Sequence, residues 1–179
     1  MRYKKHKQYR LPDFNYASDG EYFVTICTYN RKHYFGQIKN GEMILNNAGN
    51  IVDKLWNEIP SKFQNISLDV NQVMPNHFHG IIIINEENFI NEIPTFKSGI
   101  KNNPMELKTI TLGKIIRWFK GRFKFETKKL NPNFKWQSRF HDRIIRDEKE
   151  FYFIREYIIN NPVNWDKGIL DKYFEDVGI

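Results

Sequence analysis

The chain of 179 residues has a single cysteine, Cys27, and its longest apolar run, from Gly80 to Ile84, covers five residues. One cysteine excludes an intrachain disulfide framework and a cysteine-rich zinc site. A run of five is far below the roughly 20 apolar residues of a membrane-spanning helix. No signal-peptide pattern appears either, so we expect an intracellular, cytoplasmic protein without membrane contact. Cys27 lies in an alternating strand pattern and is expected to be buried packing rather than a nucleophile.

Acidic residues are scarce in two stretches of this basic chain. The net charge is +7, and between residues 101 and 146 thirteen Lys or Arg side chains stand against three acids. Positive charge concentrated in this way predicts an anionic partner, with nucleic acid as the first candidate. Residues 1–12 form a basic arm without an acid, which is either a solvated tail or a segment that contacts phosphate, for instance through Arg10.

Two histidines, His77 and His79, precede four consecutive isoleucines. A β-branched run of this kind predicts a buried strand, whose side chains alternate between the two faces of a sheet. His77, His79 and Ile81 should therefore share one face, and Phe78 and Ile82 should pack in the core on the other. Two imidazoles in next-but-one positions on a strand can grip one metal ion. A His-x-His pair is also compatible with two ordinary histidines of a sheet, so the rest of the chain must supply the chemistry.

Alternation and turn residues predict the other strands. They cover residues 22–28, a hairpin over 33–45 that turns at Asn40 and Gly41, residues 66–74, and the end of the segment 136–146. The strand over 66–74 should pair antiparallel with the histidine strand, because only a tight turn separates them.

Helical spacing of apolar residues predicts three helices. The first runs from about Asn47 to Ile59 with Pro60 at its end, and the second is capped by Thr111. The third helix starts with a capping-box pattern of Asp147 and Glu150, runs from Phe151 to about Asn160, and is ended by Pro162. Residues 85–108 are polar and broken by prolines, which predicts a long loop or a flap.

These elements predict one α+β domain over residues 1–179, with no internal repeat. Antiparallel strands with the helices gathered on one face would give a sandwich that is ferredoxin-like in outline.

A basic surface is expected on the second helix and on the segment that follows it. The candidate DNA-binding residues, together with Arg10, are Lys114, Arg117, Lys120, Arg122, Lys124, Trp136, Arg139, Arg143 and Arg146. Ordinary solvated helices mix charges of both signs, which favours a nucleic-acid surface here. Trp136, Arg139 and Arg143 fit two interpretations equally well: core and surface residues, or residues that stack on and clamp a displaced base.

The last helix carries Tyr157 and, four residues later, Asn161, so both lie on one face. A tyrosine beside a metal ion that holds a phosphate can attack the phosphorus of a DNA strand, giving a phosphotyrosine link and a free 3′-hydroxyl. The alternative is that Tyr157 packs in the core, since Ile154 and Ile158 show that this helix has an apolar face.

Several motifs in this order resemble the single-tyrosine HUH transposases, and most of all the REP-associated tyrosine transposases of bacterial chromosomes. They are Met74-Pro-Asn-His-Phe-His79, Trp136-Gln-x-Arg-Phe140, Ile144-Ile-Arg-Asp147 and Tyr157-Ile-x-x-Asn-Pro-Val163. The resemblance runs from about Tyr9 to Leu170. The chain departs from the family after Val163, where four residues intervene before Gly168, and in the segment 85–103, which looks longer than usual.

The resemblance implies an RRM-like HUH nuclease fold with the histidine strand central in an antiparallel sheet. It implies that His77, His79 and Asn161 bind Mg²⁺ or Mn²⁺ and that Tyr157 is the nucleophile, with Asn160 as a rival for the third ligand. It also implies single-stranded DNA folded into hairpins as substrate, and a monomer or homodimer acting at the bacterial nucleoid.

Two other functions are compatible with the same residues. One is a domesticated protein that binds hairpin or single-stranded DNA without cutting it. The other is a metal-dependent hydrolase in which the histidines activate water and Tyr157 has no role.

Overall fold

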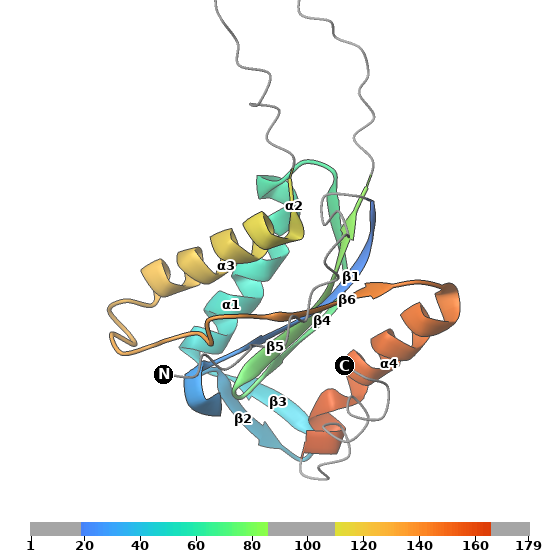
Figure 1. Cartoon of the computed structure of the whole chain (residues 1–179). Coiled ribbons are helices and arrows are strands. Elements are labelled where there is room, and N and C mark those ends of the chain that lie inside the picture. The colour runs from blue at the N-terminus through green and yellow to red at the C-terminus, as the bar shows by residue number, and fades with distance from the viewer. Residues whose placement is uncertain (1–18, 86–109, 166–179) are drawn as a thin grey trace, which may run out of the picture.

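The computed structural model describes residues 19–85 and 110–165 (Figure 1). The predicted basic arm over residues 1–12, with Arg10, lies outside these residues, and so does the predicted loop or flap except for Asn85.

A four-stranded antiparallel sheet forms the centre of the molecule, with strand order β4-β5-β1-β6. The strands are β1 (Gly20–Cys27), β4 (Ile66–Met74), β5 (His77–Ile84) and β6 (His141–Ile145). The histidine strand β5 lies inside the sheet between β4 and β1, which explains why it is rich in isoleucine on both faces. The predicted antiparallel pair of β4 and β5 and the central position of β5 are confirmed.

A small hairpin of β2 (Gly36–Lys39) and β3 (Glu42–Leu45) stands apart from the main sheet. Its two turn residues, Asn40 and Gly41, both have positive φ, at 53° and 77°. Asparagine and glycine tolerate this left-handed geometry, which two-residue hairpins require. The predicted turn is confirmed. A short 3₁₀ helix, η1 (Tyr29–Arg31), lies between β1 and this hairpin.

The first two predicted helices form, the second with the predicted N-cap Thr111 and the first with Asn46, which was not predicted as a cap. Asn46 Oδ1 accepts a hydrogen bond from the Gly49 amide at the start of α1 (Asn47–Asn57), and Thr111 Oγ1 accepts one from the Lys114 amide at the start of α3 (Leu112–Glu126). Pro60 does not simply end α1. It lies in the first turn of a separate short helix, α2 (Ile59–Lys62), where the missing N–H of proline costs no hydrogen bond.

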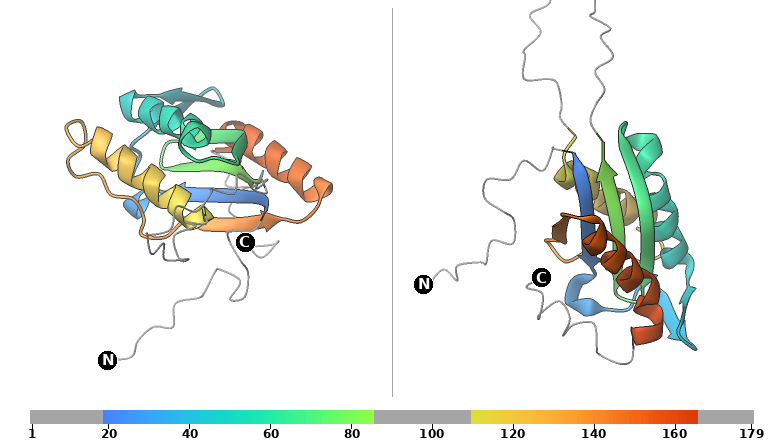
Figure 2. Two further views of the ribbon diagram at one scale, coloured as in Figure 1. Left: turned by 90° about the horizontal axis from the view of Figure 1, so that it is seen from above. Right: turned by 90° about the vertical axis from the view of Figure 1, so that its right-hand side faces the viewer.

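The helices cover both faces of the sheet, as Figure 2 shows. Helices α1 and α3 pack on the face formed by Tyr22, Val24 and Phe78, whereas α4 (Glu148–Asn164) packs on the opposite face over Phe23 and Ile81. The α+β class is confirmed, but the prediction that the helices gather on one face is wrong. Strand alternation gives two apolar faces, and each of them needs a cover.

Helix α4 has the predicted N-cap, Asp147, but starts at Glu148 rather than Phe151 and ends later than predicted. Asp147 Oδ1 accepts a hydrogen bond from the Glu150 amide at 2.8 Å, as an N-cap should. The helix does not stop at Asn160 but continues through Pro162 to Asn164. Proline has no N–H, so its presence costs the helix one backbone hydrogen bond, which the rest of α4 tolerates near its end, and the Trp165 amide closes the helix by donating to the Pro162 carbonyl.

One glycine shows how tightly the α1 side of the sheet is packed. A Cβ atom on Gly80 would lie 2.4 Å from Cζ2 of Trp56, whose ring packs against Phe78 with centroids 4.5 Å apart. Gly80→Ala should therefore lower the free energy of unfolding by about 1–3 kcal/mol through overpacking, as measured by urea denaturation.

The matched control is Gly121→Ala in α3, where a new Cβ would meet no atom within 4 Å. That change should leave the stability unchanged or raise it by up to about 1 kcal/mol, since alanine favours helix. Equal stability of the Gly80 variant and the wild type would contradict the described packing of Trp56.

Candidate active site

His77 and His79 lie side by side on the face of β5 that α4 covers. Their relative exposures are 7% and 3%, and their ring centroids are 4.5 Å apart. Ile81, two residues on, belongs to the apolar cluster under α4, whereas Phe78 and Ile82 belong to the opposite core. The predicted division of this strand between the two faces is confirmed.

Hydrogen bonds orient both imidazole rings through Nδ1. His77 Nδ1 donates to Asn76 Oδ1 at 2.6 Å, and His79 Nδ1 lies 2.9 Å from Thr25 Oγ1 on the neighbouring strand. With the proton on Nδ1, each ring has its Nε2 lone pair available for a metal ion or a proton donor.

The protein holds both imidazoles in the neutral form. Burial, followed by the charge of Arg31, lowers the pKa of His77 from 6.5 to about 3. Burial, followed by the charges of His77 and Arg31, lowers the pKa of His79 well below its usual range. Neutral imidazole is the form that binds metal ions.

Tyr157 on α4 points at this pair. Its hydroxyl lies 3.2 Å from His79 Nε2, and its ring packs edge-on against His79 with centroids 5.2 Å apart. Phe23 on β1 contacts both side chains, stacked on His79 and edge-on to Tyr157. Tyr152, on the same helix, is 69% exposed. The structure therefore brings together, within one chain, the tyrosine and the histidines that were singled out from the sequence.

The two asparagines that compete as third ligand differ in environment. Asn161 is 2% exposed, and its Nδ2 is buried without a hydrogen-bond partner. Asn160 is exposed, and its Nδ2 donates to the carbonyl and the carboxylate of Glu156 one turn earlier. A buried amide that lacks a partner is the one expected to meet a further group.

These residues fit a divalent metal ion. Two neutral imidazoles lie side by side at next-but-one positions of β5, and the buried Asn161 on the facing helix can offer its amide oxygen, Oδ1, as a further ligand. In the described parts of the chain, three or more His, Cys, Asp or Glu side chains nowhere gather as a metal site. A third protein ligand in this part of the chain would therefore come from an amide rather than from a carboxylate.

Two residues of this face were not singled out from the sequence. His141 on β6 pairs with Thr25 in the strand register, and Thr25 pairs with His79 on its other side. Arg31, in η1, has a charge that lowers the pKa of all three histidines, after burial in each case. The position of His141 beside Thr25 and His79 follows from the pairing of strands that are distant in sequence. Spacing along the chain therefore gave no signal for it.

Trp165, at the end of α4, covers the outer side of the pair. Its ring stacks on His77 with centroids 5.9 Å apart and meets His33 edge-on at 5.7 Å. His33 itself is exposed.

The basic residues of α3 lie on the other side of the sheet from the histidines, because α3 packs on the opposite face (Figure 2). Lys114, Arg117, Arg122 and Lys124 are exposed. Three of them contribute to a shallow groove of about 480 Å³, which is lined by Lys114, Arg117, Trp118, Gly121, Arg122 and Phe125.

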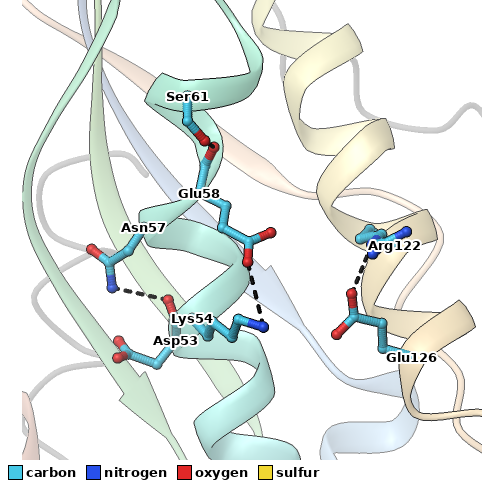
Figure 3. A network of polar contacts seen from close by, with 7 residues as sticks. All are labelled: Asp53, Lys54, Asn57, Glu58, Ser61, Arg122 and Glu126. Carbon is cyan, nitrogen blue, oxygen red and sulfur yellow. Dashed lines mark hydrogen bonds and ion pairs between the residues drawn. The ribbon is translucent and has the colours of Figure 1, made fainter.

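Two basic side chains of α3, Arg122 and Lys120, form contacts within the protein. Arg122 forms an ion pair with Glu126 at 2.7 Å, one turn later in the helix (Figure 3). Lys120 donates to the carbonyls of Gln137 and Ser138, at 2.7 and 3.2 Å, and burial lowers its pKa. Lys120 thus fastens the segment after α3 to the helix.

The remaining candidates divide between structure and surface. Trp136 packs among aromatic rings on the α3 side, and its Nε1 donates to the Lys120 carbonyl at 3.2 Å, which favours the core interpretation. Arg143 forms an ion pair with Glu150 of α4. Arg139 and Arg146 are exposed. Cys27 is buried, as predicted.

Comparison with known proteins identifies a relative and a structural neighbour. An uncharacterized protein of Haemophilus influenzae is 39% identical over 171 residues, which cover 90% of each chain. A REP-associated tyrosine transposase bound to a REP hairpin aligns with a TM-score of 0.58 and 21% identity, over 89% of this chain and 74% of that one. No family model matches the sequence. Within residues 19–85 and 110–165, every helix is too short or too polar to cross a membrane.

The buried histidines make stability depend on pH in a defined direction. Unfolded, His77 binds a proton near pH 6.5, whereas folded it does so only near pH 3. The unfolded state therefore binds more protons in this window, and stability is lost as the pH falls through it. His77→Gln should make the fall in unfolding free energy between pH 6 and 4.5 shallower by about 1 kcal/mol per pH unit, as measured by urea denaturation.

His33→Gln replaces an exposed histidine and serves as the matched control, which should keep the wild-type slope. The absolute stability of either variant does not enter the comparison. If the slope of His77→Gln equals that of the wild type, the burial of a neutral His77 is wrong.

Proposed function

The chain belongs to the same protein family as the Haemophilus influenzae protein and has the fold of a REP-associated tyrosine transposase, and from this premise we propose that it is a metal-dependent single-tyrosine transposase. It would cut hairpin-bearing single-stranded DNA and transfer the strand through a 5′-phosphotyrosine intermediate. The observation that carries this proposal is the 3.2 Å contact between the Tyr157 hydroxyl and His79 Nε2, beside His77.

In the proposed reaction the Tyr157 oxygen attacks the phosphorus of a phosphodiester. A bond forms between that oxygen and phosphorus, and the bond from phosphorus to the 3′-oxygen breaks. The tyrosine proton is given up to solvent and the leaving 3′-oxygen gains one, so that the link remains a singly charged phosphodiester. Another 3′-hydroxyl can reverse the step and join a new strand, since the covalent link conserves the bond energy.

His77, His79 and Asn161 are the residues that would hold Mg²⁺ or Mn²⁺. When bound, the ion would polarise a non-bridging oxygen of the phosphate and offset the charge that develops there. Asn76 and Thr25 keep the two rings turned so that Nε2 faces this position, through their contacts with Nδ1.

One contact of the present arrangement cannot persist in the loaded state. His79 Nε2 cannot accept a hydrogen bond from Tyr157 while it donates its lone pair to a metal ion. A metal ion held by His79 would therefore take the place of this contact with the Tyr157 hydroxyl. Phe23, which contacts both rings, limits how far that side chain moves.

Two observations support DNA as the partner: the similarity to a DNA-bound structure and the chemistry of a groove on α3. The structural neighbour was captured with a REP hairpin, and this chain offers a basic groove on α3 with two aromatic side chains. Lys and Arg side chains can contact phosphates without reading sequence, while exposed aromatic rings can stack on bases. Phe125, at the edge of the groove, is 71% exposed.

The direct test of the reaction is covalent capture. Incubation with labelled single-stranded hairpin DNA and Mn²⁺ should give a protein–DNA adduct that survives denaturing electrophoresis. Tyr157→Phe should abolish the adduct, because it removes the attacking oxygen and keeps the ring. Tyr152→Phe, which removes a hydroxyl from an exposed tyrosine on the same helix, is the control and should form adduct like the wild type.

The other outcomes identify the other candidate functions. DNA binding without any adduct or cutting by the wild type would indicate a non-cleaving DNA-binding protein. Cutting that persists in Tyr157→Phe would indicate hydrolysis by an activated water. Loss of the adduct in Tyr152→Phe alone would place the nucleophile elsewhere on α4.

Metal binding can be measured without DNA or activity. In calorimetric titration with Mn²⁺, Asn161→Ala should weaken binding by about 10-fold or more, and His77→Ala should weaken it further because it removes an imidazole ligand. Asn160→Ala is the matched control at the neighbouring position and should bind as the wild type does. The reverse order of the two asparagine variants would show that Asn160 is the ligand.

A further inference from the structure

We propose that Arg31, together with His141, forms a second phosphate-binding subsite on the catalytic face, next to the histidine pair. It would hold a phosphodiester of the single-stranded DNA that flanks the one attacked by Tyr157. The inference rests on the proposed function for the identity of the ligand, and on the structure for its place.

The strand register creates a polar row across the whole sheet. Gln72 on β4 pairs with His79 on β5, His79 pairs with Thr25 on β1, and Thr25 pairs with His141 on β6. Directly paired residues of neighbouring strands point to the same face. His141 therefore lies on the same face as His79, two strand spacings or about 10 Å away.

Arg31 is tied to the same end of the sheet by the segment that follows β1. The Thr28 amide donates to the carbonyl of Asn76 at 2.9 Å, the Thr28 hydroxyl lies 2.7 Å from the Lys32 carbonyl and 2.9 Å from that of Asn76, and the Arg31 amide donates to the Thr28 carbonyl. Arg31 is thereby anchored beside the residue that precedes His77. In agreement with this position, its charge contributes to lowering the pKa of His77, His79 and His141, in each case after burial.

The backbone at this point adopts a conformation that arginine rarely takes. Asn30 and Arg31 have φ values of 54° and 50°, in the left-handed region. Asparagine tolerates this region well, but arginine has no local hydrogen bond that favours it. Strained residues of this kind concentrate at binding and catalytic sites, where the surrounding structure holds them in place.

Some arginines of the described chain form ion pairs with carboxylates, whereas Arg31, like Arg117, Arg139 and Arg146, forms none with another described residue. Arg122, Arg143 and Arg155 each form an ion pair with a carboxylate. Arg31 is exposed, and among residues 19–85 and 110–165 no carboxylate forms an ion pair with it. An exposed guanidinium near neutral imidazoles suits a phosphate, which accepts two parallel hydrogen bonds from it.

These observations predict the path of the DNA. A strand whose reacting phosphate lies at the histidine pair would continue along the polar row toward β6, and its next phosphates would pass Arg31 and His141. The groove on α3 lies on the other face of the sheet and does not compete for this segment.

Binding of an unstructured single-stranded oligonucleotide tests the subsite. The assay is fluorescence anisotropy in the Tyr157→Phe background, so that cleavage does not interfere. Arg31→Ala should weaken binding by about 10- to 100-fold, the effect of one lost charge-assisted hydrogen-bond pair. It should also reduce the slope of log K against log salt by about 0.7, as expected when one phosphate contact of a single strand is lost.

Lys32→Ala is the matched control, because it removes an exposed cation at the next position of the same segment. It should retain the affinity and the salt slope of the parent protein, and Arg31→Lys should restore the slope. Mn²⁺ affinity of Arg31→Ala should not fall, which separates a phosphate contact from damage to the histidine pair.

The inference is overturned if Arg31→Ala binds the oligonucleotide like the parent, or if Lys32→Ala loses as much as Arg31→Ala does. Failure of the proposed function is distinguishable, since it appears as the absence of an adduct in the wild-type protein. The oligonucleotide affinities test the subsite whether or not the wild-type protein forms the covalent adduct.

Discussion

The position of α4 across the sheet is the constraint on which the site depends. Two ion pairs join this helix to opposite edges of the sheet, one from Glu150 to Arg143 on β6 and one from Arg155 to Asp69 on β4. Between them, apolar side chains of α4 pack over Phe23 and the isoleucines of β5. Packing alone would allow a helix to slide or rotate on an apolar face. The polar contacts at both edges fix its register, and with it the place of the tyrosine.

Much of this arrangement could be predicted from local sequence. The caps at Thr111 and Asp147, the hairpin at Asn40 and Gly41, and the faces of β5 all follow from short-range rules that depend on neighbouring residues. The strand pairing of β4 with β5 follows from the tight turn between them. The contact between Tyr157 and His79 does not, because it joins residues 78 positions apart. It was expected from the family resemblance, not from the spacing.

The predictions that were wrong or incomplete each have a physical cause. The helices were assigned to one face because nothing local tells which side of a sheet a helix will cover. The end of α4 was placed too early, because the general rule about proline does not consider how few hydrogen bonds remain in a last turn. His141 was not singled out, because its relation to His79 passes through β1 and no spacing along the chain indicates it.

Charge counting also needs the structure. The excess of Lys and Arg between residues 101 and 146 is real, but Lys120, Arg122 and Arg143 bind groups of the protein itself. The exposed remainder on α3 is separated from the histidines by the full thickness of the sheet. A single basic surface beside the reacting groups, the simplest interpretation of the sequence, is not what the fold provides. Arg31, which lies outside that basic segment, is the cation whose charge lowers the pKa of both buried imidazoles, after burial itself.

Pro162 weakens the attachment of the last turn of α4 to the rest of the helix. Because proline has no N–H, the final turn is attached to the preceding one by fewer bonds than the rest of the helix. Tyr157 lies in the part of α4 where every turn can form its backbone hydrogen bonds, whereas Asn161 and Trp165 flank the proline where one bond is missing. A small tilt of that end would carry the amide and the indole together, changing the cover of His77 while the phenol stays in register.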